Sequence, residues 1–356
     1  MNKNYKLAVV GATGLVGRTA LKVLLEKKLP ISEYKFFSSS KSAGSKIKFL
    51  DRDYEVSELK EDSFDEGFDF AIFSAGAETS KKFAPIAIKN NCIVIDNSSA
   101  FRMEESVPLV VPEVNPEAIW KNKGIIANPN CSTIQAVVAL KPLEDKYKIK
   151  RIIYSTYQAV SGAGKKGVED LENGIYGINE LKKFPHQIFN NCLPHIDSFL
   201  DNGYTKEEMK MINETRKILS RPDLNITATT VRVPVFNSHS ESINVEFEQD
   251  FDLDELKQLL SNSKGIIVKD DIYNNVYPLA KDVSGLDDVF IGRIRRDFSS
   301  PYAINMWVVA DNVRKGAATN AIQILEELLI QYKKFWWIKH RDFSMFFVIF
   351  CSMFIF

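Results

Sequence analysis

A glycine-rich turn between an apolar run and an amphipathic segment constrains the fold of this chain more than any other feature. Residues 6–10 (KLAVV) predict a short buried strand, and GATGLVG at residues 11–17 follows directly. Apolar residues at positions 16, 20, 21, 24 and 25 then recur at helical spacing. This order of strand, glycine turn and helix allows a pyrophosphate to approach the backbone N–H groups at the N-terminus of the helix, where the helix dipole is positive. The alternative is a tight turn with close helix packing and no ligand.

Further apolar runs continue this pattern at residues 34–37, 68–73 and 92–95, and residues 80–90 between them predict a helix. Alternating strands and helices are typical of a parallel, doubly wound sheet. We therefore expect an N-terminal Rossmann-like domain over residues 1–130.

The pattern changes after Cys131. A helix is expected over residues 132–146, and residues 243–247 (INVEF) alternate apolar and polar side chains. Similar strands are expected at 226–235, 289–295 and 302–309. This predicts a second, α+β domain over residues 131–312 with a mixed or antiparallel sheet. A helix from Gly316 to about residue 332, within the segment 313–334, is expected to pack back on the first domain.

Composition narrows the class of partner. With 356 residues the chain is too long for a single core of ordinary size. Lys plus Arg and Asp plus Glu both number 46, so the sequence predicts no nucleic-acid surface and favours a small-molecule partner. The four cysteines form no C-x-x-C pair and follow no signal peptide, which indicates free thiols and a cytoplasmic location. No metal site is expected.

The end of the chain, residues 335–356, is atypically apolar. Its apolar run over residues 343–356 is shorter than the roughly 20 residues that a membrane-spanning helix needs. We expect an atypical extension rather than a membrane anchor, and no membrane partner.

The segment after the second expected strand bears on cofactor choice. An NAD enzyme usually places an acidic residue there to hold the ribose hydroxyls. Here residues 38–42 read SSSKS, hydroxyls plus one cation, which suit a 2′-phosphate. The segment favours NADP, with a solvated polar loop as the alternative.

Cys131 is the strongest candidate nucleophile. It stands in NPNCST, between a short apolar run and the start of an expected helix. A helix N-terminus stabilises a thiolate, the nucleophilic form of cysteine. The amides of the first helical turn are also candidate donors to a carbonyl oxygen that gains negative charge. Cys92 and Cys192 are expected to be inert.

His239 is the candidate acid/base. It lies in the polar segment 237–241, which we expect to be a loop between two strands and a suitable place for a titrating imidazole. His186 and His195 stand beside prolines and are expected to be structural, and His340 lies in the apolar tail.

The chain resembles the aspartate-semialdehyde dehydrogenase family, in particular the bacterial branch in which NPNCST is followed by Ile-Gln. The motifs run in order from about residue 5 to 332: GATGLVG, FSAG, DNSSAFR, VPLVVPEVN, NPNCST, STYQAVSGAG, EEMKM, VRVPVFNSHSES and GRIRRD. The resemblance implies a homodimer built through the second domain.

The resemblance also implies roles for single residues. Cys131 would attack an acyl phosphate, and His239 would act as acid/base. Gln158 would position the substrate, Arg232 would clamp its α-carboxylate, and Glu207 would meet its α-ammonium, with Glu208 as a rival. The departing phosphate would be held by Arg102, Asn130 and Lys210. NADP would be contacted by Gly11, Thr13, Gly14, Leu15, Val16, Lys41, Ser42, Ser161, Gly162 and Asn312. Lys41 aligns where the family more often has Arg, which weakens the NADP preference.

The implied reaction is the NADPH-dependent reductive dephosphorylation of L-4-aspartyl phosphate to L-aspartate 4-semialdehyde through a cysteine thioester. It belongs to the biosynthesis of lysine, threonine, methionine, isoleucine and diaminopimelate. Three alternatives stay open: an N-acetyl-γ-glutamyl-phosphate reductase, a glyceraldehyde-phosphate dehydrogenase and a non-catalytic nucleotide-binding protein. The acidic Glu207 argues against the first, whose substrate carries no ammonium. The second is disfavoured because no acidic residue stands in the cofactor loop.

Overall fold

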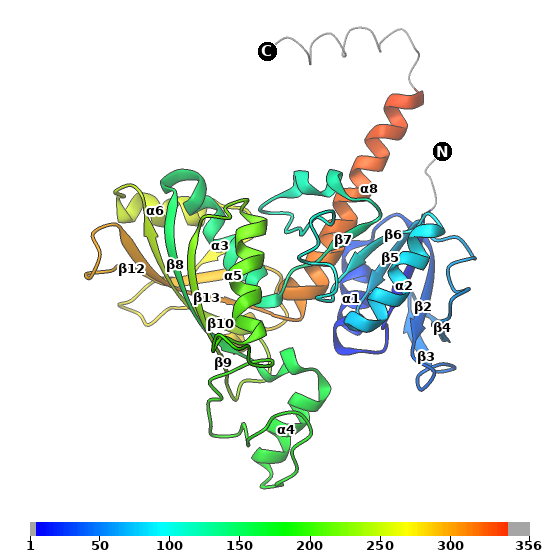
Figure 1. Ribbon diagram of the computed structural model, residues 1–356, viewed down its shortest axis with the longest axis horizontal. Helices are drawn as coiled ribbons and strands as arrows, with labels where there is room; N and C mark the ends of the chain where they lie inside the picture. Colours follow the sequence, from blue (N-terminus) through cyan, green and yellow to red (C-terminus); the bar gives the residue numbers. More distant parts are fainter. Residues whose placement is uncertain (1–4, 341–356) are drawn as a thin grey trace.

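The computed structural model describes residues 5–340, with side chains over residues 5–330. Two sheets, each with its own helices, lie side by side (Figure 1). The expected fold class, a Rossmann-like doubly wound sheet followed by a second domain with a mixed sheet, is confirmed.

The first sheet has seven strands in the order β3-β4-β2-β1-β5-β6-β7, parallel except for β3 at one edge. Its strands are β1 (Tyr5–Val10), β2 (Ile31–Ser38), β3 (Lys46–Phe49), β4 (Arg52–Glu58), β5 (Phe70–Phe73), β6 (Ile93–Asp96) and β7 (Ile125–Ala127). The central strand β5 is apolar throughout and β1 is apolar from Leu7 to Val10, as expected for a sheet that helices cover on both faces.

Helix α1 (Leu15–Lys27) shares one buried cluster with the C-terminal helix, and α2 (Ala77–Lys89) packs on the opposite face. The chain crosses from β1 to α1 at the glycine turn, at the carboxyl end of a central strand. In parallel sheets this edge, where strand order reverses around β1, is where ligands bind.

The second sheet has the order β11-β12-β13-β10-β8-β9 and mixes parallel with antiparallel pairs. Its strands are β8 (Ile149–Gln158), β9 (Asn225–Arg232), β10 (His239–Phe247), β11 (Ile266–Val268), β12 (Val289–Arg296) and β13 (Ala303–Ala310). The associated helices are α3 (Cys131–Tyr147), α4 (Lys165–Ile175), α5 (Lys206–Ile218), α6 (Leu253–Ser261) and α7 (Ala280–Val283). Burial alternates along β10, as the sequence predicted, because α3 covers one face of the sheet.

The C-terminal helix differs from the expectation at its start. Residues Arg314–Ala318 form a π-helical turn, and α8 (Thr319–His340) begins three residues after Gly316. Ala321, Ile322 and Leu325 are fully buried in the cluster formed by α1 and β1, so α8 packs on the first sheet as expected. The apolar run over residues 343–356 lies outside the described residues. Within residues 5–340, no helix has the length and apolar character needed to cross a bilayer.

Candidate active site

A cavity of about 640 Å³ opens between the two sheets and collects most of the predicted site residues. Segments that follow β1, β5 and β6 form one wall, and residues from the second sheet and its helices form the other. The predicted residues that line it are Val16, Arg102, Asn130, Cys131, Gln158, Ser161, Gly162, Glu207, Lys210, Arg232 and Asn312.

Cys131 is the first residue of α3 and is half-buried in the cavity wall. Asn130 caps this helix, and its Oδ1 accepts the backbone N–H groups of Ser132 (3.0 Å) and Thr133 (3.2 Å). The cap explains why the helix begins at the cysteine. It also corrects the expectation for the first-turn amides, since those of Ser132 and Thr133 already have an acceptor within the protein.

The acidity of Cys131 differs from the expectation of a stabilised thiolate. Burial, followed by the negative charge of Glu207, raises the pKa of the thiol to about 12. Arg232 and Arg102 act in the opposite direction but do not compensate. The resting cysteine is therefore a thiol at neutral pH, because the nearby carboxylate and burial outweigh the helix N-terminus.

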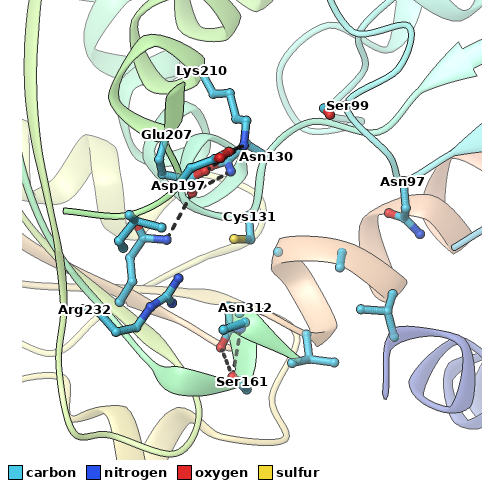
Figure 2. A pocket seen from close by; sticks show the side chains of 18 of the residues that line it. Asn97, Ser99, Asn130, Cys131, Ser161, Asp197, Glu207, Lys210, Arg232 and Asn312 are labelled. Carbon is cyan, nitrogen blue, oxygen red and sulfur yellow. Dashed lines mark hydrogen bonds and ion pairs between the residues drawn. The ribbon is translucent and has the colours of Figure 1, made fainter. Parts of the chain in front are cut away.

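Glu207 is the centre of a polar cluster beside Cys131 (Figure 2). Its Oε1 accepts hydrogen bonds from Asn130 Nδ2 (2.8 Å) and Gln158 Nε2 (3.2 Å), and its Oε2 pairs with Lys210 Nζ (3.0 Å). Burial opposes ionisation, but the charge of Lys210 and these hydrogen bonds outweigh it, so the pKa of Glu207 is lowered. The side chain is a buried carboxylate facing the cavity and not a solvated helix residue.

Glu208, the rival for this role, points elsewhere. Its carboxylate closes a capping box with Thr205 at the start of α5 and also accepts the backbone N–H of Thr230 on β9. Because both oxygens are used in these backbone contacts, the geometry favours Glu207 as the substrate-facing acid.

Three cations surround the cluster. Lys210 bridges Glu207 and Asp197, and its Nζ lies 2.8 Å from Asp197 Oδ2. Arg232 donates from Nη1 to the carbonyl of Ala159 (2.6 Å), while its buried Nε has no partner among the described residues. Arg102 donates to the carbonyls of Asn128 and Asn97 and pairs with Glu214, leaving two of its five N–H groups for a ligand.

His239 is the first residue of β10 and is fully buried, so the prediction of a polar loop between two strands is wrong at this position. Its Nδ1 accepts the backbone N–H of Ala159 (3.0 Å), which places the ring proton on Nε2. Burial, with the charge of Arg232, holds the pKa of His239 well below its usual range. The resting ring is a neutral donor, and Nε2 has no partner among the described residues.

Gly162 leaves room in front of this imidazole. A Cβ at position 162 would lie 3.2 Å from His239 Nε2 and 3.0 Å from Arg232 Nη1. Gly162 and Arg232 line the cavity, whereas His239 does not line it and lies next to Gly162.

The glycine turn has the form that a dinucleotide requires. A Cβ on Gly11 would lie 2.4 Å from the carbonyl oxygen of Ser74, and one on Gly17 would lie 2.2 Å from that of Gly11. Gly14 is freer, with its nearest neighbour at 3.4 Å. The first and third glycines thus allow close packing, and the second leaves backbone open at the N-terminus of α1.

The predicted cofactor residues fall into two groups. Thr13 lies beside Ser38 (2.8 Å between hydroxyls) and Ser42 (3.5 Å), and the exposed Lys41 makes no ion pair with a described residue. Ser161 and Asn312 are hydrogen-bonded across the cavity wall (Figure 2). Gly11, Thr13, Gly14, Leu15, Lys41 and Ser42 do not line the cavity itself, and Val16 connects them to it.

The sequence did not indicate several of the residues that line the cavity, and it predicted a structural role for one of them, His195. They are Asn97, Ser98, Ser99, Lys183, Phe184, His195 and Asp197. The backbone of 182–184 is held by Asp170, whose carboxylate accepts three consecutive N–H groups. No local pattern indicates this arrangement, although DNSSAFR, which contains the three residues after β6, was part of the family resemblance.

Comparisons with known proteins agree with this geometry. Residues 6–122 match the family described as semialdehyde dehydrogenase, NAD binding domain, and residues 140–315 match semialdehyde dehydrogenase, dimerisation domain. The aspartate-semialdehyde dehydrogenase of Aquifex aeolicus is 54% identical over 333 residues, which cover 91% of this chain and 98% of the relative. That of Bacillus subtilis is 46% identical over 342 residues, covering 92% and 98%.

Solved structures give the same result. Aspartate semialdehyde dehydrogenase II from Vibrio cholerae has a TM-score of 0.89 and 46% identity, covering 93% of this chain and 100% of its own. The enzyme from Candida albicans, solved with NADP, has a TM-score of 0.72 and 28% identity over 92% and 98% of the two chains. Identity of 46% to 54% over nearly the whole length shows that the chain belongs to the aspartate-semialdehyde dehydrogenase family.

Proposed function

We propose that this chain catalyses the NADPH-dependent reductive dephosphorylation of L-4-aspartyl phosphate to L-aspartate 4-semialdehyde through a thioester on Cys131. The observation that carries the proposal is the shared cavity wall of Cys131, Glu207 and Arg232. These groups suit an α-amino acid with an activated side chain. The thiol of Cys131 would attack the acyl carbon, the carboxylate of Glu207 would bind the α-ammonium, and the guanidinium of Arg232 would bind the α-carboxylate.

Substrate recognition follows from charge. The open N–H groups of Arg232 suit the α-carboxylate, and Glu207 suits the α-ammonium. A substrate with an acylated amino group offers no positive charge to the carboxylate of Glu207, which disfavours N-acetyl-γ-glutamyl phosphate. The phosphate would meet Arg102 and Lys210. The side chain of Asn130 already donates to Glu207 and caps α3, so Asn130 would support the site mainly by holding these two elements in place.

Acylation begins from the protonated thiol. The sulfur of Cys131 forms a bond to the acyl carbon, the bond from that carbon to the phosphate oxygen breaks, and the thiol proton leaves with phosphate as HPO4²⁻. An ammonium bound at Glu207 offsets the charge that raises the thiol pKa. Substrate binding therefore favours the thiolate at the moment it is needed.

Reduction uses His239 as a donor. NADPH, when bound, supplies the hydride that reduces the thioester carbonyl. The Nε2–H of His239 donates a hydrogen bond to the carbonyl oxygen and stabilises the negative charge that it gains. When the oxyanion collapses, the carbon–sulfur bond breaks, the aldehyde forms, and the thiolate of Cys131 takes up a proton from water. Gln158, held by Glu207 and Thr156, positions the substrate.

The residues present fit NADP. Gly14 exposes backbone at the start of α1 for the pyrophosphate, and Ser38, Lys41 and Ser42 offer hydroxyls and a cation at the carboxyl end of β2 for a 2′-phosphate. Val16, Ser161, Gly162 and Asn312 continue from this end into the cavity. We propose NADP as the preferred cofactor on this basis.

We also propose a homodimer formed through the second domain, residues 131–312. The sheet face opposite α3 carries Tyr157 and Trp307, whose rings lie 5.4 Å apart, and Tyr157 is 39% exposed. Large apolar side chains at a partly exposed sheet face are typical of a protein interface. A cytoplasmic role in lysine, threonine, methionine, isoleucine and diaminopimelate biosynthesis completes the proposal.

The test is the reverse reaction, the phosphate-dependent reduction of NADP by L-aspartate semialdehyde. The wild type should turn over and C131A should lose activity by several orders of magnitude while remaining folded. Turnover of N-acetyl-glutamate semialdehyde in place of the aspartate compound would transfer the assignment to the reductase of that substrate. Folded wild-type protein that turns over neither would indicate a binding protein.

A further inference from the structure

Glu241 is a fully buried carboxylic acid that the proposed reaction does not use. It lies on β10 two residues after His239, so both side chains occupy the sheet face that α3 covers. Thr156 on β8 and Val308 on β13 are its neighbours across the sheet, and both are fully buried. The carboxyl group is therefore enclosed in the centre of the sheet, under the first turns of the helix that carries Cys131.

No positive charge within residues 5–330 balances this group. Neither carboxyl oxygen of Glu241 has a hydrogen-bond partner among the described residues, and no cation pairs with it. Arg102 is paired with Glu214, and Lys210 is shared by Glu207 and Asp197. Because an isolated carboxylate in such a place loses its hydration without compensation, the neutral acid is favoured.

Two polar atoms on α3 also lack partners, and one of them, the hydroxyl of Ser132, lies close enough to Glu241 to influence its pKa. Ser132 and Gln135 lie three residues apart on one face of α3, and Ser132 Oγ and Gln135 Oε1 are buried without a hydrogen bond. Gln135 Nε2 donates to the backbone carbonyl of His239 (3.3 Å), so this helix face contacts the start of β10. A neutral acid supplies the donor that Gln135 Oε1 lacks and an acceptor for the Ser132 hydroxyl.

We propose that Glu241 is a positioning residue that acts as a neutral carboxylic acid, bonding Ser132 and Gln135 directly or through one buried water. Its effect on catalysis rests on the proposed function of Cys131 and His239. Ser132 follows the nucleophile, and Gln135 holds the backbone of His239. The cluster of Glu241, Ser132 and Gln135 thus fixes the two reacting groups relative to each other.

The electrostatics agree with this geometry. Burial raises the pKa of Glu241 well above its usual range, and the negative charge of Glu207 adds to that effect, while the Ser132 hydroxyl opposes it. A charged Glu241 would add a second carboxylate near Cys131, which would make the thiolate harder to form. Neutrality is therefore necessary for the site as well as favoured by burial.

Two variants separate a neutral donor from the other roles. E241Q keeps the shape, the neutrality and a donor, whereas E241M keeps the volume but has no donor. We expect E241Q to retain wild-type kcat within about threefold. E241M should lose about 10- to 100-fold in kcat with KM for semialdehyde and phosphate little changed, because a misplaced reacting group costs that order of rate.

Infrared difference spectroscopy of wild type against E241Q provides a readout independent of activity. A carbonyl stretching band of a protonated, buried carboxylic acid should be present in the wild type at neutral pH and absent in E241Q. If E241Q does not fold, E241D should shift the same band by changing the surroundings of the acid.

Three results would overturn the inference: no such band in the wild type, loss of kcat in E241Q as severe as in E241M, or full kcat in both variants. A wild type that shows the band but has no dehydrogenase activity would refute the proposed function and leave the protonation state of Glu241 established.

Discussion

At the scale of single residues, the charge on Glu207 couples substrate binding to the reactivity of Cys131. The carboxylate is ionised and buried, and it lies on the same cavity wall as the thiol whose pKa it raises. The free enzyme is expected to protect its thiol from stray electrophiles and oxidants, since only the thiolate reacts readily.

E207Q tests this coupling through the pH dependence of alkylation. Removing the negative charge should lower the pKa of Cys131 from about 12, so iodoacetamide should react faster with E207Q than with wild type between about pH 8 and 10. The rate is measured by mass spectrometry of the peptide containing Cys131. E208Q is the matched control. We expect it to be alkylated at the wild-type rate and to have a lower thermal midpoint, because the substitution weakens the capping box at the start of α5. Equal rates in E207Q and wild type would contradict the coupling.

G162A tests the space in front of His239. The added methyl group would press on His239 Nε2 and Arg232 Nη1, and we expect kcat/KM to fall about 10- to 100-fold. Backbone strain is not expected because Gly162 does not have a positive φ. The thermal midpoint of G162A should therefore stay near the wild-type value. A G162A variant with the wild-type kcat/KM would show that the space beside His239 and Arg232 is not needed for the reaction.

The sequence predicted the place of Cys131 because a strand-to-helix turn is a local pattern. It did not predict the raised pKa of the thiol, since Glu207 is brought beside it only by the packing of α5 against α3. His239 was placed wrongly for a related reason. Its polar neighbours suggested a loop, but β10 pairs on both sides and buries the ring.

At the scale of elements, a buried network fixes the π-helical turn that precedes α8. Lys315 is fully buried and its Nζ contacts Glu113 Oε2 (2.6 Å), Asn320 Oδ1 and Gln323 Oε1. The next residue, Gly316, lies against the nucleophile, since a Cβ there would come within 3.0 Å of Cys131 Cβ. The network therefore supports one wall of the active site.

E113A should destabilise the protein by about 3–5 kcal/mol at pH 7, because it leaves the buried Lys315 unpaired. Burial opposes ionisation of Glu113, but Lys315 outweighs it and lowers the Glu113 pKa. The pair thus stabilises the fold above the unfolded-state pKa of about 4.3, and this contribution is lost as pH falls through the lower folded-state pKa.

Urea unfolding should show a smaller loss of stability in acid for E113A than for wild type. The double variant E113A/K315M, which removes both charges, should recover part of the loss, and a double variant no more stable than E113A would count against the argument.

The sequence predicted α1, α2, α3 and α8 and most of the central strands, but not α5, β8 or the hairpin of β3 and β4. Its two-residue turn, Leu50 and Asp51, has positive φ at both positions, a conformation usually marked by Asn or Gly. The π-helical turn was also missed, because RKGAA resembles an ordinary helix start and the buried pairing of Lys315 is a long-range contact.

At the scale of the whole molecule, the two sheets bring together residues from most of the chain, and the assembly is proposed to be a dimer. Ser242 lies at the centre of the face that carries Trp307, opposite Ser155 and Trp307 in the sheet.

S242R should place a charge in the proposed dimer interface. In analytical ultracentrifugation this variant should sediment with a mass near that of one chain, 40.4 kDa, whereas the wild type should sediment with twice that mass. K150A, at an exposed position on β8, serves as the control. A wild type that sediments as a monomer would refute the dimer.

The most direct test of the thioester is a single turnover without phosphate. Wild-type protein mixed with L-aspartate semialdehyde and NADP should release a burst of about one NADPH per active site and then stop, because the acyl group stays on the enzyme until phosphate accepts it. Mass spectrometry should find an aspartyl adduct on Cys131, and added phosphate should remove it and restart turnover. Steady turnover with phosphate but no burst and no adduct without it would contradict a covalent intermediate on Cys131.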